Sequence, residues 1–266
     1  NFIFKNKNNN NNNNIFINNY FCFGNYERYL YKKNKIKVKN FINFGSMRLL
    51  NYLQYRKKTQ TNKVKERFDI CLLSDQGAWY NNLKNYNEIK KGIVLLIKYT
   101  LKFSKKYNLK LVIALKRQKN DRLGGIFFYQ EQSFFQDNLT NEEYKYAKEV
   151  FFNKKNKYNV YDLIINSKVT VGTISSCLRE GLALNKKVLV CNFTKSNIYD
   201  FPIDGLCKLK NRSYKLFETR LSTILKMNFK IYKKKLSKNQ DYVLDFQNIK
   251  AAKKKLFNII NLKKKK

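Results

Sequence analysis

The stretch KVTVGTISSCLREGLALNKKVLVCNF, residues 168–193, predicts a strand, a helix and a second strand in direct succession. The apolar runs at 168–172 and 187–193 are short and continuous, which is typical of strands covered on both faces of a parallel sheet. Between them, residues 175–184 have the pattern of a helix, and Asn185 suits the left-handed position that ends one. The stretch therefore predicts part of a parallel α/β sheet.

The segments on either side continue this alternation. Residues 68–75 and 109–117 are further apolar runs that predict buried strands. Amphipathic or capped segments predict helices at residues 87–106, 140–152, 160–166, 214–227 and 249–262. The alternation of strands and helices favours a doubly wound, Rossmann-like, mostly parallel α/β sheet. Such sheets bind ligands beyond the carboxyl ends of their strands.

Composition changes towards the ends of the chain and predicts the domain boundaries. Residues 1–20 are rich in asparagine and have little to bury, so we expect disorder there. Residues 21–66 mix aromatic and basic positions and end in a polar linker, residues 67–262 form the sheet domain, and residues 263–266 are a basic tail. Because the chain starts at Asn1 without a methionine, we expect a fragment of a longer protein.

The net charge is extreme: 56 Lys and Arg against 18 Asp and Glu give +38. A nucleic acid or an anionic membrane is the direct interpretation of such a charge. However, lysine far outnumbers arginine, and lysine, asparagine, isoleucine, phenylalanine and tyrosine are all residues of AT-rich codons. Drift of an AT-rich genome therefore accounts for most of the charge, which argues against nucleic acid and leaves weak attraction to anionic membranes as a side effect.

Several classes of site are excluded by composition alone. The chain has no histidine, which rules out a Ser-His-Asp triad, a Cys-His dyad and any zinc site with a histidine ligand. The five cysteines form no CxxC pair and predict buried free thiols in a reducing compartment. No apolar run approaches the roughly 20 residues that span a bilayer. We therefore expect a cytoplasmic protein.

The turn after the strand at 168–172 is the most informative loop. Gly172 allows close backbone approach, Thr173, Ser175 and Ser176 supply hydroxyls, and the free amides of a helix start favour an anion. Phosphate is the natural ligand of such a turn. The alternative is that a serine merely caps the helix.

Glu180 lies one turn into the following helix, between Arg179 and Gly181. A carboxylate just past a phosphate-binding helix start can accept hydrogen bonds from sugar hydroxyls. The alternative is a solvated glutamate favoured by the helix dipole.

The complete segment 168–193, with its GTxSS turn, EGLAL helix and NKKVLV strand, resembles the donor-nucleotide motif of GT-B glycosyltransferases. It looks most like the bacterial surface-carbohydrate and capsular-polysaccharide group, which is related to CDP-glycerol glycerophosphotransferases. The resemblance covers roughly residues 22–262. It includes Phe44-Gly45-Ser46, similar to the end of an N-terminal acceptor domain, and residues 241–246, similar to an extended segment before a final helix.

The resemblance assigns roles to residues of the motif. It implies that Gly172, Thr173, Ser175 and Ser176 hold the donor phosphates and that Glu180 binds the donor ribose. It also implies a nucleotide-sugar donor, a glycan or lipid-linked acceptor, and a remnant of an N-terminal domain in residues 21–66. No metal or other cofactor is expected for such a transfer, and together with the charge the resemblance suggests peripheral contact with the inner membrane. Two differences from the family limit which of its roles can be assigned to this chain. The UDP-N-acetylglucosamine 2-epimerases, which are related to this group, use a histidine in their site, and this chain has none. Inverting GT-B enzymes generally take their catalytic base from the N-terminal domain, of which we expect only the last part in this chain.

The other loops at the carboxyl ends of strands supply further candidates. Asp75 could accept a proton or hydrogen bond from an acceptor sugar and is the only candidate for catalysis, although a tight polar turn explains it as well. Lys116 and Arg117 could offset the charge of the donor phosphates. Glu131, in the aromatic segment 127–135, belongs either to a lid over the acceptor or to ordinary packing, which we favour.

Three functions remain open from the sequence. The first is transfer of a sugar from a nucleotide-activated donor to a cell-surface glycan. The second is transfer of a polyol phosphate from a CDP-linked donor, which uses the same fold. The third is nucleic-acid binding, for which the interleaved aromatic and lysine residues at 20–55 could offer stacking platforms. An inactive fragment that binds nucleotide without turning it over is a variant of the first.

Overall fold

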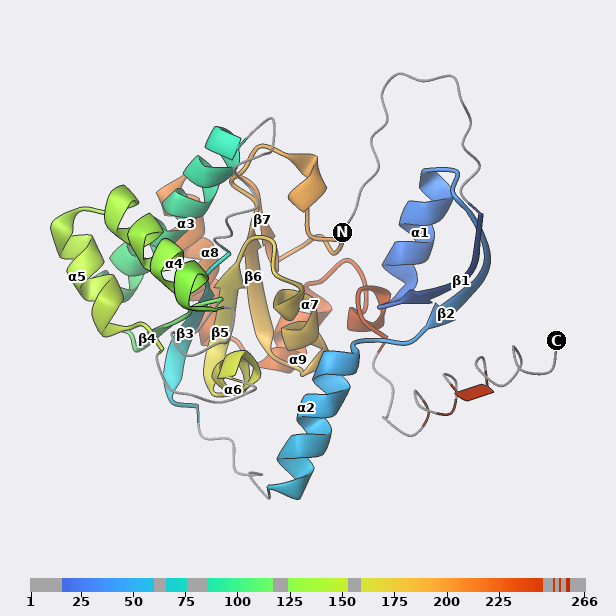
Figure 1. Cartoon of the computed structure of the whole chain (residues 1–266). Helices are drawn as coiled ribbons and strands as arrows, with labels where there is room; N and C mark the ends of the chain where they lie inside the picture. The colour runs from blue at the N-terminus through green and yellow to red at the C-terminus, as the bar shows by residue number, and fades with distance from the viewer. Residues whose placement is uncertain are drawn as a thin grey trace. The chain divides into compact units, whose positions relative to one another are not determined.

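The computed structural model describes residues 16–59, 66–75, 86–116, 124–152 and 159–245, together with residues 251, 254, 257 and 258. The chain divides into two compact units (Figure 1). One unit comprises the chain up to residue 60 and again from residue 239, and the other comprises residues 61–238. The sheet domain thus ends near residue 238 and not at residue 262, as predicted from the sequence.

A parallel pair of strands joined by a helix forms the first unit. The chain runs from β1 (Phe16–Cys22) through α1 (Asn25–Lys33) to β2 (Lys37–Asn43), and β1 pairs with β2 in parallel. α2 (Met47–Lys58) follows, and the Ser46 hydroxyl caps it by accepting the Leu49 amide at 3.2 Å.

The expected disorder of residues 1–20 is wrong for residues 16–20, which belong to β1. Strand pairing and ring packing order them: the ring of Tyr20 lies 4.3 Å from that of Tyr31 and 6.2 Å from that of Phe41. Residues 1–15 lie outside the described part of the chain.

Close backbone contacts explain why the residues after 239 belong to the first unit. A Cβ on Gly24 would lie 2.7 Å from the carbonyl oxygen of Asp241, and a Cβ on Gly45 would lie 2.6 Å from that of Asp245. The Asp245 amide also donates to the carbonyl of Phe23 at 2.7 Å. Within this segment, η3 (Gln240–Tyr242) is a 3-10 turn rather than the extended chain predicted for residues 241–246. Most of the helix predicted at 249–262 lies outside the described residues.

The second unit contains a five-stranded, fully parallel sheet with the order β4-β3-β5-β6-β7. Its strands are β3 (Phe68–Leu73), β4 (Leu111–Ala114), β5 (Ser167–Gly172), β6 (Lys187–Cys191) and β7 (Lys208–Leu209). Residues from 70 to 73 in β3 and from 188 to 191 in β6 are all buried, as expected for strands covered on both faces. The predicted α/β fold with a Rossmann-like parallel sheet is confirmed.

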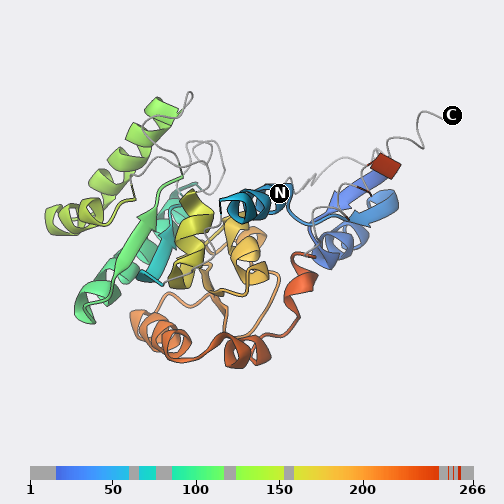
Figure 2. The same cartoon turned by 90° about the horizontal axis from the view of Figure 1, so that it is seen from below.

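Helices cover both faces of this sheet (Figure 2). From β3 the chain passes through α3 to β4 at one edge, and from β5 it passes through α7 to β6 in the opposite direction. Because parallel crossovers are right-handed, these two connections place α3 and α7 on opposite faces. α8 contacts α3, and α6 contacts α7, so each face carries a pair. The helices are α3 (Tyr86–Lys106), α4 (Gly124–Asn138), α5 (Asn141–Glu149), α6 (Asn159–Ile165), α7 (Ser176–Ala183), α8 (Tyr214–Lys226) and α9 (Phe229–Lys234).

Local signals in the sequence agree with several helix ends. The capping box of α5 forms, since the Thr140 amide donates to the Glu143 carboxylate at 2.9 Å and the Glu143 amide donates to the Thr140 hydroxyl at 3.3 Å. Asn185 has φ 58° just after α7, in the predicted left-handed position. α5 ends at Glu149, earlier than predicted, because Phe151 forms a bridge with Ile113 of β4.

α3 comes into backbone contact with the loop after β6. A Cβ on Gly92 would lie 2.6 Å from both the carbonyl carbon and the oxygen of Phe193. Arg212 holds the same carbonyl, because its Nε donates to the Phe193 oxygen at 2.7 Å and its guanidinium pairs with Glu88 of α3 at 3.3 Å. Gly92 is therefore required by close approach rather than by an unusual backbone conformation.

The start of β6 secures the C-terminal end of α8. Lys187 Nζ donates to the carbonyls of Ile224 at 2.8 Å, Leu225 at 3.2 Å and Met227 at 2.6 Å. Carbonyls at a helix end lack partners within the helix, and a lysine supplies them with charge-assisted bonds. Burial lowers the pKa of this ammonium group.

All five cysteines are buried free thiols, as predicted. Burial raises the pKa of Cys22 to about 11 and that of Cys207 to about 12. Such thiols are poor nucleophiles at neutral pH. In the described part of the chain, every helix is too short or too polar to cross a membrane.

Candidate functional site

The sheet of the second unit changes winding direction between β3 and β5. β3 pairs with β4 on one side and with β5 on the other, and the chain visits β4 before it returns to β5. In open parallel sheets the crevice beyond the carboxyl ends at such a switch point is the usual ligand site. The segments that begin with Ser74 after β3 and with Thr173 after β5 therefore define the candidate site.

At this edge the Asp75 carboxylate occupies the turn before α7. Its Oδ2 accepts hydrogen bonds from the amides of Thr173 at 2.6 Å and Ile174 at 2.9 Å. Asp75 is only 7% exposed, and burial raises the pKa of its carboxyl group, against the opposing effect of these amides and of the Lys116 charge. The sequence placed Asp75 and the turn at the same edge, but their direct contact is a finding of the structure.

The residue before Asp75 and the residue that supplies one of the two amides, Ser74 and Thr173, each carry a buried hydroxyl. Ser74 is 6% exposed and Thr173 is 3% exposed, and neither hydroxyl has a hydrogen-bond partner within the described part of the chain. A buried polar group without a partner costs free energy, and bound water or a ligand usually supplies the partner. Thr170, inside β5, has a similarly unpartnered hydroxyl, but it lies within the strand rather than at its carboxyl end.

The remaining residues of the turn divide into two roles. Gly172 ends β5, and a Cβ there would meet only side-chain atoms of Leu178 and Leu73 at 3.3–3.4 Å, so its backbone does not demand glycine. The Ser175 hydroxyl caps α7 by accepting the Cys177 amide at 3.3 Å, as the structural alternative proposed. Ser176 is exposed at the first turn of α7.

Glu180 is buried in α7, with 3% exposure. The interpretation of Glu180 as a solvated glutamate is therefore wrong. Next to it, Gly181 packs closely, since a Cβ there would lie 3.3 Å from a methyl of Ile164. A buried carboxylate needs hydrogen bonds or an opposite charge to remain ionised.

The backbone at the end of β4 is held by Glu131, which the sequence had offered as part of a lid over the acceptor. The segment predicted as an aromatic loop forms the helix α4, from which the buried Glu131 accepts the Lys116 amide at 3.1 and 3.0 Å. Phe135 is fully buried and packs on Phe151 with ring centroids 5.0 Å apart. These contacts support the packing interpretation of Glu131. The Lys116 side chain is exposed, and Arg117 lies outside the described residues.

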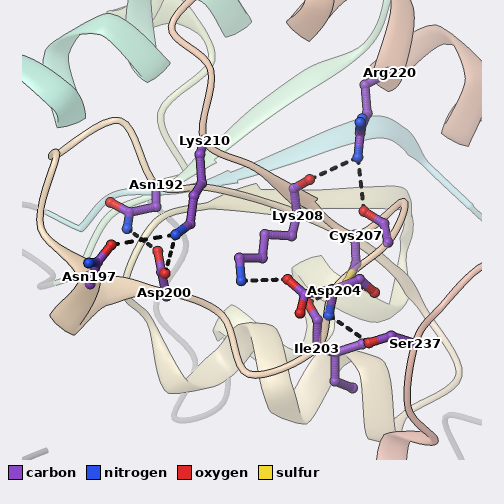
Figure 3. Close-up of polar contacts among 11 residues, drawn as sticks. Asn192, Asn197, Asp200, Ile203, Asp204, Cys207, Lys208, Lys210, Arg220 and Ser237 are labelled. Carbon is purple, nitrogen blue, oxygen red and sulfur yellow. Dashed lines mark hydrogen bonds and ion pairs between the residues drawn. The ribbon is translucent and has the colours of Figure 1, made fainter.

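A second polar cluster, which was not predicted from the sequence, lies at the carboxyl ends of β6 and β7 (Figure 3). Asn192 Nδ2 donates to Asp200 Oδ1 at 2.6 Å, and Asp200 also pairs with Lys210. Thr194 donates its hydroxyl to Asn192 Oδ1 at 2.6 Å. The sequence marked the loop after β6 as one to examine but offered no signal for these pairs, because they depend on how the loop folds back.

Nearby, polar contacts fasten the start of β7. Arg220 donates to the carbonyls of Gly205 at 2.9 Å and Lys208 at 2.8 Å, and Lys208 pairs with Asp204 at 2.6 Å (Figure 3). The polar groups in these contacts are partners of one another, and together they stabilise the edge of the sheet. For metal binding, the described residues offer no group of three or more acidic or cysteine side chains close enough to share an ion.

No protein-family model matches this chain, and no curated protein matches its sequence.

Proposed function

We propose that the second unit binds a nucleotide-activated sugar at the carboxyl ends of β3 and β5, as the donor half of a GT-B-type glycosyltransferase. The acceptor would be a cell-surface glycan or a lipid-linked precursor. The observation that carries the proposal is the pair of buried hydroxyls, Ser74 and Thr173, without partners among the described residues at the switch point of a parallel sheet.

The proposed donor contacts use residues from three elements. Phosphate oxygens would accept from the Thr173, Ser175 and Ser176 hydroxyls and from amides of the turn that begins at Gly172. Glu180 would accept from the ribose hydroxyls. Lys116 and Arg117 would offset the phosphate charge, with Lys116 close enough to act on Asp75 electrostatically. No metal is needed in this scheme, because protein cations and helix amides stabilise the departing nucleotide.

The Thr173 hydroxyl offers a direct test. Thr173→Val keeps the shape of the side chain and removes its hydroxyl, so we expect UDP or CDP affinity to fall about three- to tenfold, the effect of one neutral hydrogen bond. Thr170→Val makes the same change inside β5, three residues before Thr173, and should leave affinity unchanged. Isothermal titration calorimetry measures both. Equal affinities for all three proteins would contradict a phosphate contact at Thr173.

A phosphotransferase that moves a polyol phosphate from a CDP-linked donor is the alternative with the same fold. The two activities differ in what they add to the acceptor. Mass spectrometry of the product distinguishes a sugar increment from a polyol-phosphate increment.

The exposed lysines around α9 form a described surface that fits an anionic membrane. No acidic residue occurs between Glu218 and Asp241, and Ile231 is 46% exposed among the lysines. Tyr232 anchors α9 by donating to the carbonyl of Val188, at the start of β6, at 2.6 Å. The lysine cluster thus lies towards the amino-terminal edge of the sheet, away from the proposed donor site. Its members are Lys226, Lys230, Lys233, Lys234, Lys235 and Lys238, all exposed.

Charge reversal tests this membrane contact. Each lysine near an anionic surface contributes about 1 kcal/mol, so Lys233→Glu with Lys234→Glu should weaken binding to phosphatidylglycerol vesicles at low salt at least about tenfold. The matched control is Lys145→Glu with Lys148→Glu, two exposed lysines of α5. Sedimentation with vesicles measures the bound fraction. Equal losses in both variants would show that only total charge matters and would remove α9 as the contact.

A further inference from the structure

We propose that Asp75 is an internal competitor of the ligand: its carboxylate occupies the two backbone amides that a phosphate oxygen of the ligand would take. An anionic ligand must then displace Asp75 to bind in the turn. This inference rests on the proposed function, since it takes the nucleotide phosphate as the ligand. It gives Asp75 a role in ligand selection instead of the catalytic role predicted from the sequence.

The geometry of the contact is that of an occupied anion site. The amides of Thr173 and Ile174 converge on one oxygen, Asp75 Oδ2, at 2.6 and 2.9 Å. These amides directly precede α7, where the helix dipole also favours negative charge. A carboxylate oxygen and a phosphate oxygen make the same demand on such amides, so only one of them can be held at a time.

The hydroxyls of Ser74 and Thr173 indicate that the hydrogen bonds of Asp75 do more than connect β3 to α7. A purely structural bond would need only the carboxylate and the two amides. However, Ser74, which precedes Asp75, and Thr173, which supplies one of the amides, are both buried and have hydroxyls without a partner in the described residues. A carboxylate has two oxygens, both on one planar group, whereas a phosphate presents three around a tetrahedron and can serve the amides and the hydroxyls together.

The charges around the turn favour replacement of the Asp75 carboxylate by a phosphate of the ligand. Burial disfavours the charged form of Asp75, which raises the pKa of its carboxyl group, and the Lys116 charge that partly offsets this effect would also favour a phosphate. A small inorganic anion gains only the turn contacts and has to displace a group that is already there. A nucleotide adds ribose and base contacts, so Asp75 selects for the larger ligand.

Asp75→Asn tests this role by the sign of its effect. Asparagine keeps an oxygen for the two amides but removes the charge that repels a phosphate, so UDP affinity should rise about tenfold. Inorganic phosphate, too weak to displace the wild-type carboxylate, should bind measurably to the variant. The matched control is Asp69→Asn, which removes the same charge at the opposite end of β3, where Asp69 pairs with Lys168 at 2.7 Å. It should leave UDP affinity unchanged.

Asp75→Ala provides a second measurement that does not depend on asparagine. Without ligand this variant leaves two amides unpaired and should melt below the wild type. Saturating UDP should raise its melting temperature more than that of the wild type, because the ligand then meets an empty turn. If the wild type binds UDP and Asp75→Asn binds it equally or more weakly, the competitor role is wrong and the proposed function stands. If no variant binds UDP, the proposed function fails and this inference fails with it.

Discussion

Gly92→Ala lowers the free energy of unfolding of the second unit by about 1–3 kcal/mol or more, the range for an atom forced into a packed site. The added Cβ would lie 2.6 Å from the carbonyl group of Phe193, which is backbone and cannot turn aside. α3 and the loop after β6 would have to separate. Their separation would also strain the bonds from Arg212 to Phe193 and Glu88.

Urea unfolding followed by circular dichroism measures the effect of Gly92→Ala. The control is Gly181→Ala, another helical glycine, whose Cβ would meet only methyl groups at 3.3 and 3.5 Å. At this position the higher helix propensity of alanine offsets much of the cost of the tighter contact, so the free energy of unfolding should change little. Equal destabilisation of the two variants would contradict the close approach of α3.

Glu180→Ala should reduce the affinity for UDP or CDP about 10- to 100-fold, provided that Glu180 binds the donor ribose as proposed. Hydrogen bonds to a charged group contribute about 1.5–3 kcal/mol, which corresponds to this range. Glu180 is 3% exposed, so water cannot replace the lost contacts easily. Glu180→Gln keeps the size and one carbonyl oxygen of the side chain and should lie between the alanine variant and the wild type.

Calorimetric titration of the Glu180 variants needs a control for the loss of a buried carboxylate in general. Glu27→Gln serves, because Glu27 is 6% exposed in the first unit and bonds its own helix start through the Gly24 amide at 3.0 Å. Undiminished nucleotide affinity in Glu180→Ala would remove the ribose assignment. A loss of the same size in Glu27→Gln would point to an indirect effect on folding.

The parts of the fold that were predictable are those encoded by short-range pattern. Continuous apolar runs around Leu72, Ile113 and Leu189 mark buried parallel strands, and the capping box at Thr140 marks a helix start. α4 was missed because its aromatic residues follow no clear helical period and its sequence carries no capping signal. β1 was missed because its order comes from pairing with β2, a contact that asparagine-rich composition does not reveal.

The candidate site was predictable only to the level of the sheet edge. The turn from Gly172 to Ser176 could be recognised from its composition and its place after a strand. The bonds from Thr173 and Ile174 to Asp75 join residues almost a hundred positions apart and depend on the register of β3 against β5. The two hydroxyls without partners among the described residues and the burial of Glu180 depend on tertiary packing too, so sequence pattern alone does not predict them.

Amide NMR of the wild-type chain during titration with UDP and CDP tests the central claim most directly. The proposal places a donor phosphate at the turn between β5 and α7, where the amides of Thr173 and Ile174 now bond Asp75. We expect saturable chemical-shift changes for these two amides with at least one nucleotide, and none for the amides of the lysine cluster around α9. Unchanged Thr173 and Ile174 signals at saturating nucleotide would contradict a donor site at the carboxyl ends of β3 and β5.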